Sequence, residues 1–225
     1  VTHLTLKTNS MNFLLSLCHF PWAKNIIKLH ITNNSAKIAP YHNFNHALVV
    51  TENVWDAANH YNLQPYDLIC AALWHDFNHS QGTLKDSLNV KIAIENFVEW
   101  FSCSDYGQAW IHNQINPVNV ISIIQATEYQ DGKYTIPKDN LSLEQKIIRD
   151  ADLLQYAEKN RFGQVYLGLS HEMNVPLITL AKNAPTFINS IEPNTEWMLP
   201  KWETLKYEVL KELELIHNLL TDETA

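Results

Sequence analysis

Three short strings of this chain carry histidines and acidic residues at spacings that would bring them together. In order along the chain they are YHNFNHA at 41–47, LWHDFNH at 73–79 and RDADL at 149–153. In the first string, His42 and His46 are four residues apart, so on a helical turn they would share one face. The three strings are therefore candidates for one shared chemical site.

The second string pairs His75 with Asp76 and places His79 four residues after His75. Side chains at adjacent helical positions point about 100° apart, so His75 and Asp76 can converge on one ion only near a helix end or across a groove of a bundle. The polar residues and the glycine at 78–82 supply such a helix end. We therefore expect this pair to sit where a helix stops.

The third string adds two carboxylates, Asp150 and Asp152, within an otherwise apolar helix. Imidazole and carboxylate together suit a borderline divalent metal, and the core of a helical bundle is a usual place for such a site. Two nitrogens and two carboxylates would come from His46, His75, Asp76 and Asp152. A carboxylate can bridge two cations, so Asp76 would also reach a second ion. We interpret Asp150 as a solvated ion pair with the neighbouring Arg149.

The elements that must position these residues are helices, because apolar residues recur at helical spacing and no convincing period-2 strand pattern occurs. Pro21 predicts one broken helix or two short ones over 11–30, and short helices are expected over 162–190. Longer helices are predicted over about 44–61, 65–77, 84–102, 117–128, 142–157 and 201–220. We therefore predict an all-α, single-domain helical bundle.

Length and composition fit that prediction. The chain has 225 residues, 46% of them hydrophobic and 18% charged, which is enough apolar material for one core. No repeat or linker divides it. We assign residues 1–10 to a tail or a non-standard start and residues 11–225 to one domain, whose motif-bearing core is 41–155.

Charge and glycine usage exclude several classes of partner. The net charge is −8 and no basic stripe is present, so we expect no nucleic-acid polymer as partner. The five glycines never fall in a phosphate-cradling spacing, which argues against dinucleotide and P-loop folds. An anionic ligand would therefore need bound metals or a few local cations, and by position those cations are Lys91, Arg149 and Arg161. Isolated cysteines and the lack of a long apolar stretch predict a cytoplasmic protein without a membrane partner.

The order of these strings resembles the HD-domain metal-dependent phosphohydrolase superfamily. More narrowly, 41–47 resembles the YHNxxHA signature of the cyclic-nucleotide phosphodiesterase catalytic domain, and HDFNH at 75–79 resembles its HDxDH string. ATE at 126–128 resembles its AT[DE] string, and ADL at 151–153 its ADL string. The resemblance implies an HD-type helical bundle that binds two divalent metal ions, which could be Zn, Mn, Mg or Fe.

The resemblance also implies a role for each matched residue. The ligands of the tighter metal would be His46, His75, Asp76 and Asp152, so the ADL match selects Asp152 over Asp150. His42 would be the general acid, and His79 would lie near the weaker metal. Glu128 would lie near the metal-bound waters. The chain departs from the family at Asn78, which replaces an aspartate.

The function implied is hydrolysis, by a metal-activated hydroxide, of a phosphoester in a nucleotide or similar small molecule. Cyclic-nucleotide specificity does not carry over, because the base-gripping glutamine and aromatic residue of that family are not evident. A nucleotidase or deoxynucleoside triphosphate phosphohydrolase uses the same ligands and stays open. An HD-type di-iron oxygenase and a non-catalytic ligand-binding HD module are the other two alternatives.

Overall fold

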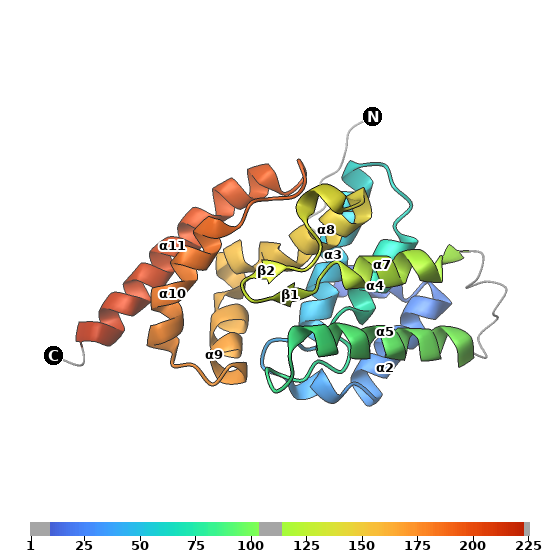
Figure 1. Cartoon of the computed structure of the whole chain (residues 1–225), viewed down its shortest axis with the longest axis horizontal. Coiled ribbons are helices and arrows are strands. Elements are labelled where there is room, and N and C mark those ends of the chain that lie inside the picture. Colours follow the sequence, from blue (N-terminus) through green and yellow to red (C-terminus); the bar gives the residue numbers. More distant parts are fainter. Residues whose placement is uncertain (1–9, 104–113, 223–225) are drawn as a thin grey trace.

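The computed structural model describes residues 10–103 and 114–222, and helices make up most of this part of the chain (Figure 1). The predicted all-helical character is confirmed to that extent. Of the tail assigned to residues 1–10, only Ser10 lies within the described residues. Among the helices of the described ranges, none has both the length and the apolar character that crossing a membrane requires.

The predicted break over 11–30 separates two short helices. Helix α1 (Ser10–Leu17) ends before Pro21, which opens α2 (Pro21–Thr32) in the first turn, where proline is tolerated. A 3-10 turn, η1 (Ser35–Ile38), follows. It leads into the segment that carries the first histidine string.

Two adjacent helices form the centre of the fold. Helix α3 (Phe44–His60) begins immediately after Asn43, whose side chain accepts hydrogen bonds from two backbone N–H groups of the first turn. Helix α4 (Tyr66–Trp74) packs against α3 and is buried along residues 68–74. The short connection between them makes the two helices neighbours, as predicted, and α4 ends just before His75.

Helices α5 (Asp86–Cys103) and α7 (Pro117–Gln125) pack against each other and against α4. The helix predicted over 117–128 ends at Gln125. A two-stranded antiparallel hairpin follows, made of β1 (Tyr129–Gln130) and β2 (Lys133–Tyr134). Strands of two residues are too short to show alternation in a sequence, which is why the sequence predicted no strand.

Helix α8 (Leu143–Leu153) carries the third string. Ser142 and Gln145 form the predicted capping box at its start, and the helix continues as a 3-10 turn, η3 (Leu154–Ala157). Arg149 and Asp150, expected to form a solvated pair, are both buried, so that expectation is wrong.

The C-terminal part begins with the 3-10 turn η4 (Lys159–Arg161) and a π-helical turn, η5 (Gly163–Leu167). It continues through α9 (Gly168–Glu172), α10 (Leu177–Ser190) and the long α11 (Leu199–Asp222). Helices α10 and α11 lie side by side at one end of the molecule, and the β1–β2 hairpin lies between them and α5 (Figure 1). A further 3-10 turn, η2 (Lys138–Asn140), joins the hairpin to α8.

Candidate metal centre

Four side chains predicted as metal ligands converge where three helices meet. His46 lies in the first turn of α3, His75 and Asp76 follow the end of α4, and Asp152 is on α8. His46 Nε2 lies 2.9 Å from Asp76 Oδ2 and 3.3 Å from Asp152 Oδ1. His75 Nε2 lies 3.2 Å from Asp76 Oδ2. The helix end thus lets the adjacent His75 and Asp76 face one point, as their spacing required.

The hydrogen bonds of the two imidazoles show which nitrogens are free for an ion. His75 Nδ1 lies 2.8 Å from the carbonyl oxygen of Ala72, a contact that requires Nδ1–H to donate. His46 Nδ1 lies 3.1 Å from the Gln155 side-chain amide, whose Oε1 is buried and has no hydrogen-bond partner among the described residues. Turning that amide over would let Oε1 accept from His46 Nδ1–H. Both Nε2 lone pairs would then point inward, and these two atoms are only 3.1 Å apart.

This donor set fits a divalent metal ion. The ligand atoms of His46, His75 and Asp152 all lie within 4.8 Å of one another. Nδ1–H groups held by a carbonyl and an amide are the usual support for metal-ligating imidazoles. Two imidazole nitrogens with two carboxylates are ligands that zinc, iron and manganese accept. The centre therefore has both the chemistry and the proximity that an ion requires.

Electrostatics at the centre favour a cation. Burial lowers the pKa of His46, but the carboxylates of Asp152 and Asp76 more than offset it and raise the pKa to about 10. Burial also lowers the pKa of His75, and Asp76 again reverses the effect. Both imidazoles are buried, whereas the two carboxylates are partly exposed. The same negative potential that draws a proton would draw a divalent cation.

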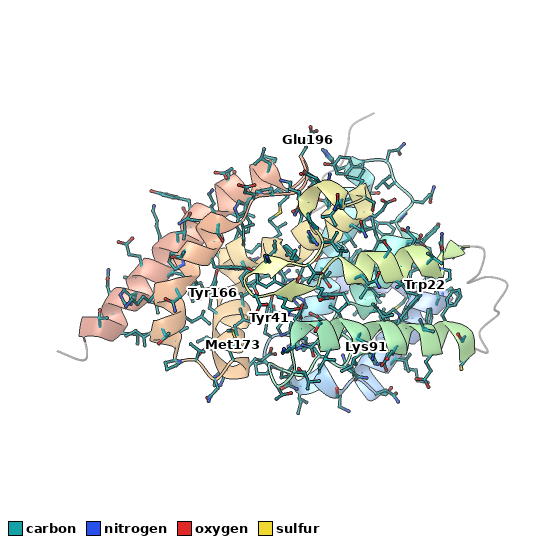
Figure 2. All side chains as sticks on the ribbon, in the orientation of Figure 1. Trp22, Tyr41, Lys91, Tyr166, Met173 and Glu196 are labelled. Carbon is teal, nitrogen blue, oxygen red and sulfur yellow. The ribbon has the colours of Figure 1, made fainter. Side chains whose placement is uncertain are left out.

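His42 lies beside this centre and is held by Glu172, a residue that the sequence did not single out. The His42 ring centroid is 5.6 Å from that of His46. Glu172 Oε1 accepts from the backbone N–H of Tyr41 at 2.7 Å and of His42 at 2.8 Å, and Glu172 Oε2 lies 2.5 Å from His42 Nδ1. Tyr41 itself is buried in the middle of the molecule (Figure 2). One carboxylate therefore fixes both the backbone and the ring of His42.

His79 stacks on the ring of His42, with ring centroids 3.9 Å apart. Its two nitrogens already have partners: the Gln81 N–H donates to Nδ1 at 3.1 Å, and the Asn89 amide lies 3.0 Å from Nε2. Burial lowers the pKa of His79 to about 4, so this ring is neutral. His42, His79 and Glu172 are close enough to suggest a second metal group. Because His42 Nδ1, both Glu172 oxygens and both His79 nitrogens already have partners, we interpret Glu172 and His79 as a support for His42.

A cavity of about 200 Å³ opens onto the centre. Its polar lining includes His42, His75, Asp76, His79 and Asp152, and its aromatic lining includes Tyr129, Tyr134, Tyr156 and Phe187. Asp86, at the start of α5, also lines it and accepts a hydrogen bond from the Tyr129 N–H at 2.6 Å. Burial, with added repulsion from Asp76 and Asp152, raises the pKa of Asp86 to about 6. Asp86 is therefore a carboxyl that can hold a proton at the cavity wall.

Other residues suggested by the sequence lie elsewhere. Glu128 is not among the described residues that line the cavity, although its neighbours Thr127 and Tyr129 are. Lys91 pairs with Glu95 on the surface of α5 (Figure 2), and Arg161 pairs with Glu158. The buried Arg149 donates to the carbonyl oxygens of Ala126 and Ile136. These three cations do not line the cavity in the described part of the chain.

Comparisons with family models, with curated proteins and with solved structures find no match to this chain. The assignment of the site as a candidate metal centre therefore depends on its geometry alone. Buried histidines and partly exposed aspartates that could hold a divalent metal ion meet at a cavity, and a carboxylate-held histidine also lines it.

Proposed function

We propose that this chain is an HD-type metal-dependent phosphohydrolase that cleaves a phosphoester of a nucleotide or similar small molecule. One observation carries the proposal. His46 and His75 converge with the carboxylates of Asp76 and Asp152, at nitrogen–oxygen distances of 2.9 to 4.0 Å, at a cavity that His42 also lines. The order of these residues along the chain and their types resemble those of the HD-domain superfamily. The three free cysteines fit a cytoplasmic setting, which we include in the proposal.

The ligands would hold a divalent ion through His46 Nε2, His75 Nε2 and the two carboxylates, and Asp76 would extend toward a second ion. A divalent ion in such a site lowers the pKa of bound water and neutralises phosphoryl oxygens. The chain has a net charge of −8, so this centre also explains how it would attract an anion that its overall charge repels.

In this proposal, His42 is the residue that would protonate the leaving group. Its Nδ1 faces Glu172, so its Nε2 is the atom left for the substrate, and the ring lies on the cavity wall. Glu172 would stabilise the imidazolium form, from which a proton can pass to a departing alkoxide. His79, stacked on the ring, keeps His42 from rotating away from the cavity. The general-acid role of His42 is thus supported by two neighbours that fix its orientation.

A panel of phosphoesters tests the proposal directly. We expect the purified full-length chain, supplied with Mn²⁺ or Mg²⁺, to hydrolyse at least one of a set of cyclic nucleotides, nucleoside monophosphates and deoxynucleoside triphosphates. Activity should stop with a chelator and return with the ion. Preference within the panel separates a phosphodiesterase from a nucleotidase or triphosphate phosphohydrolase. No hydrolysis of any member under any divalent ion would contradict the proposal.

A further inference from the structure

A second, larger cavity lies beside the candidate metal centre and is not used by the function proposed above. Its volume is about 360 Å³, and it is formed by the β1–β2 hairpin, η2, α8 and the end of α10. We call it the hairpin cavity. It shares four lining residues with the metal cavity: Tyr129, Tyr134, Leu153 and Phe187. The two cavities are therefore next to each other and separated by side chains that are mostly aromatic.

The hairpin cavity is lined by cations. Lys133, Lys138 and Arg149 line it, and Glu192 is the acid among the described lining residues. The lining is thus net positive in a chain whose net charge is −8. Asp150, next to Arg149 in the chain, reduces this local charge, but it does not line the cavity. Its carboxylate takes hydrogen bonds from Asn194 and Thr195 instead.

Arg149 is the most unusual part of this lining, because it is a buried cation whose partners are neutral. Its Nε donates to the carbonyl oxygen of Ala126 at the end of α7, and Nη2 donates to that of Ile136 at 2.8 Å. The guanidinium lies over the ring of Tyr134, 4.0 Å from its centroid. A guanidinium has five N–H donors, and these two bonds leave the others without an acceptor among the described residues. A buried guanidinium at a cavity wall is well suited to a phosphate or carboxylate.

Size supports a ligand that uses both cavities. Pockets for small molecules commonly measure about 300–1,000 Å³, so the metal cavity alone is small for a nucleotide. A phosphoester whose reacting phosphate lies at the metal centre would have its next atoms beside Tyr134 and Phe187. A further group extending past these rings would enter the hairpin cavity and meet its cations.

We propose that the hairpin cavity is an anion subsite that binds a second phosphate group of the substrate. The substrate class would then be a phosphoester that carries another phosphate, such as a nucleoside bisphosphate. The naming of a substrate rests on the proposed phosphohydrolase function. Anion binding by the hairpin cavity does not depend on that function, so the two claims can fail separately.

Titration of the metal-free, full-length protein with inorganic phosphate tests the subsite itself. Lys133 and Lys138 line the hairpin cavity and do not line the metal cavity, so a loss of binding on their replacement reports on the hairpin cavity. We expect wild-type protein to bind, the double variant Lys133→Ala/Lys138→Ala to bind about tenfold more weakly, and Glu192→Gln to bind more tightly. The matched control is Lys24→Ala/Lys28→Ala, which removes two exposed lysines from α2. The lysines are replaced because Arg149 also holds the end of α7, and its loss would disturb folding.

Three results would refute the proposal that the hairpin cavity is an anion subsite. They are no phosphate binding by wild-type protein, equal binding by the hairpin double variant, or an equal loss of binding in the α2 control.

A kinetic comparison tests whether the phosphate belongs to the substrate. With metal present, the hairpin double variant should raise KM for a nucleoside 3′,5′-bisphosphate about tenfold, with kcat and the KM for the matching monophosphate unchanged. Hydrolysis with the same KM in both proteins would refute the substrate class. Absence of all hydrolysis would refute the phosphohydrolase function, while the phosphate titration would still decide the subsite.

Discussion

Replacement of Glu172 by glutamine is the sharpest test of the role of His42. The carboxylate makes three contacts: two with the backbone N–H groups of Tyr41 and His42, and one with His42 Nδ1. Glutamine has nearly the same shape, and its amide oxygen can still accept from the backbone. The change therefore removes mainly the negative charge that faces His42 Nδ1.

The size of the effect follows from the contact that is lost. A hydrogen bond to a charged group contributes about 1.5–3 kcal/mol, and about 1.4 kcal/mol corresponds to a tenfold change in rate. If the bond stabilises His42 as the acid, Glu172→Gln should lower kcat for an alkyl phosphoester by about 10- to 150-fold.

The choice of leaving group separates acid catalysis from simple damage to the site. An alkoxide needs a proton as it departs, whereas a p-nitrophenolate leaves readily without one. We expect Glu172→Gln to slow hydrolysis of the nucleotide ester strongly and that of the p-nitrophenyl ester only slightly. Metal content should be unchanged, because Glu172 is not among the four proposed ligands.

Glu158→Gln is the matched control, since Glu158 pairs with Arg161 and does not line the metal cavity in the described residues. It should leave both rates unchanged. An unaltered kcat for the alkyl ester in Glu172→Gln would refute the reasoning. Equal losses for both leaving groups would show that Glu172 maintains the structure of the site and does not assist an acid.

Three further predictions concern the residues that surround the centre. His42→Ala should keep the metal, measured by elemental analysis, and lose turnover of alkyl esters; normal turnover would exclude the acid role. Gly168→Ala should reduce the free energy of unfolding by about 1–3 kcal/mol in denaturant titrations, because its Cβ would lie 2.9 Å from the Pro40 carbonyl oxygen. Gly163→Ala is the control and should be tolerated, because the nearest atom to its Cβ would be 3.9 Å away. Asp150→Ala should cost about 3 kcal/mol in the same assay, because the hydrogen-bond donors of the half-buried Asn194 and the buried Thr195 would lose their acceptor. The replacement of the exposed Asp139 by alanine should cost almost nothing.

Local patterns in the sequence predicted most of the helices, and they predicted that His46, His75, Asp76 and Asp152 would lie together. The helix that begins after Asn43 and the capping box at Ser142 depend on residues close in the chain. Both can therefore be predicted from the sequence without knowledge of the fold. The requirement that His75 and Asp76 sit at a helix end follows from helix geometry alone, and α4 does stop just before them. The identity of any bound metal stays a prediction.

The remaining features depend on contacts between distant segments. Glu172 is 130 residues from His42, lies on a short helix and belongs to none of the strings, so no local pattern pointed to it. Asp86 reaches the cavity because the β1–β2 hairpin folds over the start of α5. The expected pairing of Arg149 with Asp150 failed for the same reason. Each of these side chains finds its partners in another element, and both become buried.

The proposed metal centre can be tested most directly by measuring the metal content of the purified full-length protein, with Asp76→Ala as its comparison. We predict that wild-type protein retains one or two divalent ions per chain after gel filtration. Asp76→Ala should retain far less, since Asp76 contacts both imidazoles. A wild-type protein that binds no divalent ion, even after incubation with Zn²⁺, Mn²⁺ or Fe²⁺, would contradict the metal centre. Equal retention by Asp76→Ala would contradict the proposed ligand set.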